Sequence, residues 1–109
     1  MEFYHFTEFA WPHLPPEEEF TSARLNLPSS VYDPQLGADL YNMCLDQYVL
    51  ADELGLNCMV NEHHQTATCL NSSGVVPLSI LARQTKNARI LILGNPAANL
   101  ADPIRCAEE

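Results

Sequence analysis

Glu62, His63 and His64 place one carboxylate and two imidazoles in a row, directly after an apolar segment. Neutral imidazole and carboxylate groups are ligands for zinc and iron. An imidazole also exchanges a proton close to neutral pH, which suits general acid–base catalysis. A third role is the polar support of a flat cofactor. The structural alternative is that these side chains only satisfy the backbone groups of a loop.

A metal site has the least support among these roles. The sequence contains neither an H-E-x-x-H helix nor an H-x-H strand pair, and the other histidines, His5 and His13, lie far upstream. Adjacent residues of an extended chain point to opposite sides, so His63 and His64 face one ligand only if the backbone turns between them. We therefore expect one imidazole to do the chemistry and the other to support it.

The composition is that of a single globular domain. The chain has 109 residues, a hydrophobic fraction of 47%, and 14 Asp and Glu against 5 Lys and Arg, which gives a formal charge of −9. This charge repels phosphate backbones and anionic lipids, so we expect neither nucleic acid nor membrane as a partner. With no basic, apolar leader we expect a cytoplasmic protein. The four cysteines form no C-x-x-C pair, which predicts reduced thiols.

The first third of the chain predicts a strand and then a long loop. Residues 2–9 are rich in aromatic residues and predict a first strand. Residues 10–32 are rich in proline and include an acidic run at 17–19, so they predict a surface loop that is either a functional lid or a solvated insertion.

Asp33-Pro34 predicts the start of a long helix, because Asp is a favoured N-cap and Pro suits the first helical position. Gly55 predicts its end. Positions three and four residues apart should face the core, namely Leu40, Cys44, Tyr48, Ala51 and Leu54. The acidic side chains between them should face water, namely Asp39, Asp46, Asp52 and Glu53.

Residues 56–61 predict a second strand that leads into the Glu-His-His triplet. Residues 75–87 predict a second helix, with three residues facing inward, namely Leu78, Leu81 and Ala82. The aliphatic run 88–94 is typical of a strand covered on both faces of a parallel sheet. Asp102-Pro103 repeats the helix-start signal of Asp33-Pro34.

This alternation of strands and helices predicts an α/β fold with a parallel sheet. The triplet would then lie at the carboxyl end of the second strand, where β/α proteins carry their chemistry. Three strands alone would leave two unpaired edges, one of them the apolar segment 88–94. We therefore expect the chain to be the leading piece of a longer protein.

Two stretches carry a family resemblance: YDPQLGADLYNMCLDQYVLADELGLNCMVNEHHQ and SSGVVPLSILARQTKNARILILGNPAANLADPIRCAEE. In order and spacing, the chain resembles the N-terminal region of the bacterial luciferase-like, flavin-dependent monooxygenases. The most specific elements are ADELG followed by a strand and EHH, and the third strand followed by DPIRCAEE. The resemblance implies that residues 1–109 are the N-terminal part of a single TIM-like (β/α)8 barrel domain, about three β/α units, with the loop 10–32 within it.

The resemblance also implies an activity and a site. Members of the family use reduced FMN, supplied by a separate flavin reductase, and O2 to oxygenate a small organic substrate. By position, His63 would be the catalytic histidine beside the flavin, with Glu62 and His64 supporting it. Gly94 and Asn95 would be further cofactor-binding residues, near a non-prolyl cis peptide.

The phosphate of FMN requires positive charge or helix N-termini. The basic residues are predicted to lie mostly away from the site, namely Arg24, Arg83, Lys86, Arg89 and Arg105. In the family, later strands grip the phosphate, so we expect these 109 residues alone to bind FMN weakly or not at all. A homodimer is also implied, with Met43 and Val49 as candidate contacts.

Two alternatives stay open. The first is a metal-dependent TIM-barrel hydrolase in which His5, His63 or His64 coordinates zinc. The second is a fragment with no function of its own.

Overall fold

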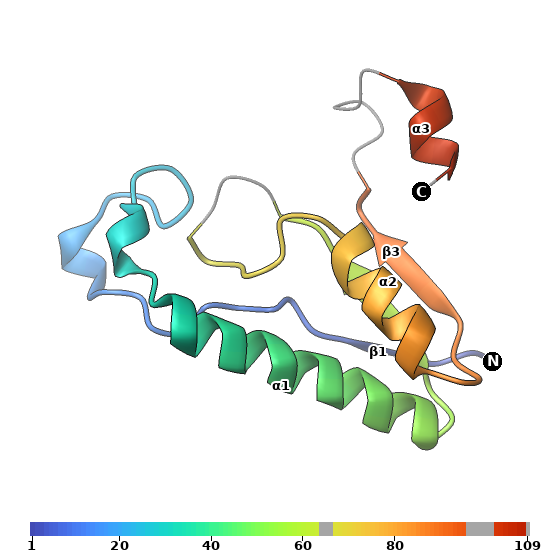
Figure 1. The fold of residues 1–109 in the computed structure, drawn as a ribbon. Helices are drawn as coiled ribbons and strands as arrows, with labels where there is room; N and C mark the ends of the chain where they lie inside the picture. Colours follow the sequence, from blue (N-terminus) through green and yellow to red (C-terminus); the bar gives the residue numbers. More distant parts are fainter. Residues whose placement is uncertain (64–66, 96–101, 109) are drawn as a thin grey trace.

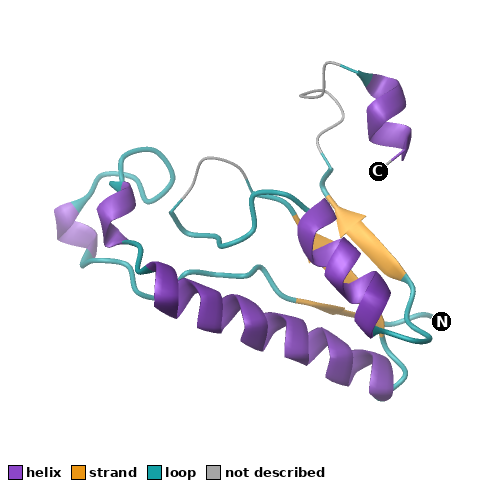
Figure 2. Ribbon diagram, in the orientation of Figure 1, coloured by secondary structure: helices purple, strands orange, loops and turns teal. Residues whose placement is uncertain are grey.

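The fold alternates strands and helices, as the sequence predicts (Figures 1 and 2). A computed structural model describes residues 1–63, 67–95 and 102–108. The elements are β1 (Tyr4–Phe6), the 3-10 turns η1 (Glu17–Glu19) and η2 (Ser29–Val31), α1 (Pro34–Glu53), β2 (Asn57–Asn61), α2 (Val75–Gln84), β3 (Ile90–Leu93) and α3 (Pro103–Glu108). Among the described residues, no helix combines the length and the apolar character that a membrane span requires.

The three strands form one parallel sheet in the order β1-β2-β3, which confirms the predicted α/β class. Strand β1 is shorter than the predicted segment 2–9. Pairing stops after Phe6, because the N–H of Thr7 donates to the hydroxyl of Tyr48 at 3.2 Å. Two residues further on, Phe9 turns the chain with a φ of 51°.

Helix α1 begins and ends where the sequence predicts. The side chain of Asp33 accepts a hydrogen bond from the N–H of Leu36 at 2.9 Å, and Pro34 occupies the first turn. At the other end, Gly55 has a φ of +80°. The N–H groups of Gly55 and Leu56 donate back to carbonyls of the last turn at 3.0 and 2.9 Å, in the arrangement of a Schellman motif.

The core lies between the sheet and the two long helices, and it occupies one face of the sheet. Its buried residues come from both helices, from β2 and from the loop after β1, namely Phe9, Cys44, Leu45, Tyr48, Cys58, Val60 and Leu81. Ile90 and Ile92 of β3 pack against this cluster from the same face. Among the described residues, Cys44, Cys58 and Cys69 are free thiols. Cys44 and Cys58 are buried, and Cys69 is partly buried.

Two residues that were predicted to face the core do not. Leu54 is 69% exposed, because it is the C-cap residue of α1 and lies beyond the last full turn. Ala82 is exposed, since the inward face of α2 is made by Pro77 and Leu81, one helical turn apart, with Ile80 beside them.

Asp52 was predicted to face water but is buried, with 6% of its surface exposed. Its carboxylate accepts hydrogen bonds from the backbone N–H groups of Lys86, Asn87 and Ala88 at 2.7, 3.0 and 2.6 Å. These bonds, the first of them above all, lower the pKa of Asp52 although burial opposes them. The end of α1 therefore fixes the turn that leads into β3.

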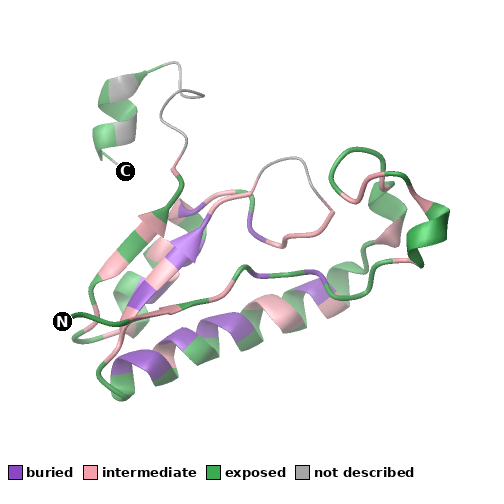
Figure 3. Ribbon diagram, turned by 180° about the vertical axis from the view of Figure 1, so that it is seen from behind, coloured by how far each residue is buried: buried purple, intermediate pink, exposed green. Residues whose placement is uncertain are grey.

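In the part of the chain that the structure describes, the second face of the sheet carries no helix (Figure 3). Residues alternate between the two faces of a strand, so Phe6, Met59, Leu91 and Leu93 share this open face in register. Leu91 and Leu93 are 44% and 47% exposed. The prediction that segment 88–94 is covered on both faces is therefore wrong for the described part of the chain, because both long helices pack on the same side.

The loop 10–32 is anchored at its two ends. Trp11 is 3% exposed, and its ring lies 5.0 Å from that of Tyr32 between centroids. The Tyr32 ring in turn covers Gly37 of α1, where a Cβ atom would lie 2.0 Å from the tyrosine oxygen. The sequence prediction of a surface loop holds for the exposed acidic turn η1 at its centre.

Candidate functional site

Glu62 and His63 lie where the sequence predicts, directly after the last residue of β2 at the carboxyl edge of the sheet. His64 lies outside the described residues. The alternation of β2 continues through this point, because Val60 is in the core and Asn61 bonds to the ring of His63 two residues on. Glu62 thus turns toward the helices and His63 toward the open face.

Glu62 caps helix α2. Its Oε2 accepts a hydrogen bond from the N–H of Gly74, the N-cap residue of α2, at 2.7 Å. A carboxylate is stabilised there by the positive end of the helix dipole. Gly74 is closely packed, since a Cβ atom at this position would lie 2.9 Å from Cγ2 of Ile92. Glu62 therefore helps to fix α2 against the carboxyl edge.

The ring of His63 is held by Asn61, a residue that the sequence analysis did not single out. Nδ2 of Asn61 lies 3.2 Å from Nδ1 of His63 and 3.2 Å from the carbonyl oxygen of Glu8. Asn61 is 2% exposed, whereas His63 is half-buried. The amide therefore links the imidazole to the loop that follows β1.

Asn71 fixes the backbone on both sides of Glu62 and so positions His63. Its carbonyl oxygen accepts from the N–H of His63 at 3.0 Å, and its Nδ2 donates to the carbonyl of Asn61 at 2.5 Å. The hydroxyl of Tyr41 on α1 lies 3.4 Å from Oδ1 of Asn71. This hydroxyl donates to Asn71, and burial raises the pKa of Tyr41 to about 12.

The loops after β1 and β2 pair with each other beside His63. Ala10 and Cys69 form an antiparallel bridge. It is flanked by hydrogen bonds from Leu70 N–H to the carbonyl of Phe9 at 2.7 Å and from Trp11 N–H to the carbonyl of Thr68 at 2.9 Å. Phe9 is a bulky residue held at positive φ, a strained conformation that such packing must maintain.

Cys69 completes this group of residues as a neutral thiol. Its Sγ lies 3.0 Å from the carbonyl oxygen of Glu8, to which it donates, and accepts from the N–H of Asn71 at 3.4 Å. Burial raises the pKa of the Cys69 thiol. Because the thiolate is the nucleophilic form, Cys69 is poorly suited to nucleophilic catalysis and serves as a packing and hydrogen-bonding residue.

Gly94 and Asn95 lie at the same edge of the sheet. Leu93 pairs with Asn61, so the residues that follow the two strands emerge side by side. Gly94 has a φ of +83°, which favours glycine, and apart from its chain neighbours no atom of the described residues lies within 4 Å of where its Cβ would be. The described peptide bonds are all trans, so the cis peptide expected near Gly94-Asn95 is not present between these residues.

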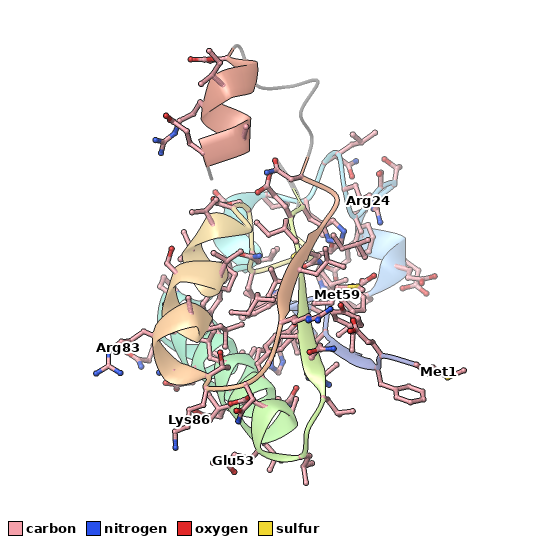
Figure 4. All side chains as sticks on the ribbon, turned by 90° about the vertical axis from the view of Figure 1, so that its right-hand side faces the viewer. Met1, Arg24, Glu53, Met59, Arg83 and Lys86 are labelled. Carbon is pink, nitrogen blue, oxygen red and sulfur yellow. The ribbon has the colours of Figure 1, made fainter. Side chains whose placement is uncertain are left out.

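The basic side chains lie mostly away from this edge, as predicted. Arg83 lies in the last turn of α2 and Lys86 in the turn before β3, whereas Arg24 lies on the long loop (Figure 4). Arg89, directly before β3, forms an exposed ion pair with Glu2, with 2.7 Å between Nη1 and Oε1. In the part of the chain that the structure describes, no three His, Cys, Asp or Glu side chains are arranged to hold a metal ion.

Sequence reasoning could have found Asn61 but not Asn71. Residues two apart in a strand share a face, so the position before Glu62 could have been recognised as a neighbour of His63. Asn71 lies in the polar segment after the triplet, which carries no periodic pattern that would place it.

Comparisons of the chain with protein-family models, with curated proteins and with solved structures gave no match.

Proposed function

We propose that this chain forms the first β/α units of a (β/α)8 barrel, and that the complete barrel is a luciferase-like monooxygenase. It would use reduced FMN and O2 to oxygenate an organic substrate. The observation that supports this proposal best is the position of His63. The imidazole follows β2 at the carboxyl edge of a parallel sheet, on the face that the helices leave open.

The arrangement of the sheet favours a barrel over an open, doubly wound sheet. The strands follow one another in sequence order, and both long helices contact the same face. A doubly wound sheet has helices on both faces, whereas a (β/α)8 barrel has them all outside. In a barrel, the uncovered apolar side chains would form the packed interior, namely Phe6, Met59, Leu91 and Leu93.

The residues present fit the ring of FMN better than its phosphate. Reduced FMN supplies the electrons that activate O2. The flat ring would lie near the apolar open face, with His63 and Gly94 at its rim, and the imidazole would hold or release a proton there. Among the described residues the phosphate has no comparable site, because the carboxylate of Glu62 already accepts from the N–H of Gly74 and places its negative charge at the start of α2. Later strands would therefore bind the phosphate.

Substitution of His63 tests the proposal. In the polypeptide that the whole gene encodes, His63→Ala should lower oxygenation by about 10²- to 10⁴-fold, the usual contribution of a general acid or base. The matched control is His13→Ala, because His13 is exposed on the long loop and its ring contacts Trp11 there. Product formation would be measured with a supplied flavin reductase. Equal turnover in the two variants would refute the assignment.

A further inference from the structure

The geometry points to a positioning role for Asn61. Its side chain selects the tautomer of His63 that carries the proton on Nε2, and Asn71 fixes the backbone so that the ring keeps this contact. The inference rests on the proposed role of His63 and extends it to the residues that act through the imidazole.

The orientation of the Asn61 amide follows from the Glu8 carbonyl. The Glu8 oxygen lies 3.2 Å from the amide and can only accept, so the atom that faces it must be Nδ2. The reverse orientation would bring two acceptors together with no hydrogen between them. An amide nitrogen has two hydrogens, and the second is directed to Nδ1 of His63 at 3.2 Å, which is nearer than Sγ of Cys69 at 4.0 Å.

This orientation of the Asn61 amide determines the tautomer of the His63 imidazole. A neutral imidazole has one N–H group and one acceptor nitrogen. Because Nδ1 accepts from Asn61, the proton must be on Nε2. His63 therefore presents its N–H donor at Nε2, which can donate to negative charge developing on an oxygen of a bound substrate.

Asn61 is a buried polar residue whose two amide atoms differ in their partners. The side chain is 2% exposed, and among the described residues its Oδ1 has no hydrogen-bond partner. A buried acceptor without a partner destabilises the folded state. The amide nitrogen, in contrast, has two partners, the Glu8 carbonyl and the His63 ring, and these bonds explain an amide at this position.

Asn71 fixes the backbone on which the contact between Asn61 and His63 depends. One bond from His63 N–H to the Asn71 carbonyl and one from Asn71 Nδ2 to the Asn61 carbonyl secure the backbone on both sides of Glu62. Since Asn71 is also 2% exposed, water has little access to compete for these bonds. The distance between the Asn61 amide and the His63 ring is thus set by the backbone.

Histidine labelled with ¹⁵N provides the test, in the polypeptide that the gene encodes. Long-range ¹H–¹⁵N spectra at a pH where the imidazoles are neutral report which ring nitrogen carries the proton. His63→Gln assigns the signal by its loss. We expect Nε2 to be protonated and Nδ1 to be unprotonated in the wild type. Asn61→Asp, whose carboxylate can only accept, should move the proton to Nδ1, and Asn61→Leu should give a mixture of both tautomers.

His5 and His13 are internal controls, since their signals should not change in either variant. A role of Asn61 limited to packing would leave the tautomer of His63 unchanged in variants whose amide spectra show an intact fold, and this result would overturn the proposal. A wild-type His63 with its proton on Nδ1 would also overturn it, even if a variant failed to fold. Failure to bind FMN would count against the proposed function and would not alter the tautomer result.

Discussion

At the scale of single residues, two tyrosines of α1 support the strand ends that carry His63. Tyr41 bonds to Asn71, and Tyr48 is fully buried beneath β1 and β2. The Tyr48 hydroxyl donates to the carbonyl of Met59 and accepts from the N–H of Thr7 at 3.2 Å. One hydroxyl therefore joins two neighbouring strands on the core side of the sheet.

Tyr48→Phe should lower the free energy of unfolding by about 1–3 kcal/mol, because two partly buried backbone groups lose their partner. Burial raises the pKa of Tyr48 from 10.0 to about 12. The folded protein then keeps a proton that the unfolded chain loses, so this stabilisation is full below the unfolded pKa and is lost as the pH rises through the folded pKa.

Urea denaturation at neutral and alkaline pH would measure both effects. Tyr4→Phe is the matched control, because the Tyr4 hydroxyl makes an exposed bond to Glu2. If Tyr48→Phe unfolds at the same urea concentration as this control, the hydroxyl does not join the strands as described. The variant should also lose less stability than the wild type on the alkaline side.

The sequence predicts the place of His63 but not its partners. The strand before it ends at a polar triplet, and that pattern is local. The bonds from Asn61 to Glu8 and from Tyr41 to Asn71 join residues 53 and 30 positions apart. Such contacts depend on how the helix and the loops pack, which periodicity does not describe.

At the scale of elements, helix starts are predicted well because their cause is local. Asp33 and Asp102 each accept a hydrogen bond from the first turn of the helix that they precede, at 2.9 Å in both cases. The end of α1 is also predicted, but the environments of the residues around it are not. Asp52 lies in the last turn of α1 and Leu54 is its C-cap residue. Each was assigned to the wrong environment, because the turn before β3 packs against Asp52 and leaves Leu54 outside.

Asp52→Asn should destabilise the protein, because a neutral amide is a weaker acceptor for three backbone N–H groups than a carboxylate. The folded pKa of Asp52 is lowered, so its stabilisation is present above the ordinary value of 3.8 and is lost as the pH falls through the folded pKa. Unfolding followed by circular dichroism from neutral to acid pH should show a smaller acid loss in the variant. Asp46→Asn, exposed on the same helix, is the control. An unchanged acid profile in Asp52→Asn would argue against the capping role.

At the scale of the whole molecule, the order of the elements predicts the parallel sheet, since β/α alternation permits few topologies. Coverage of the sheet is not predicted correctly. An aliphatic run such as residues 90–93 is compatible with helices on both sides or with the inside of a barrel, and both long helices among the described residues pack on the same side. The open face of Phe6, Met59, Leu91 and Leu93 is the feature on which the barrel proposal depends.

Anaerobic titration with reduced FMN tests the central claim most directly, with the polypeptide encoded by the whole gene compared with these 109 residues alone. We expect saturable binding by the whole polypeptide. A parallel titration, read by flavin fluorescence after reoxidation, would monitor it. The 109-residue chain should bind weakly or not at all, because its described residues offer the phosphate no comparable site. Micromolar binding by the 109 residues alone, or no binding by the whole polypeptide, would contradict the account.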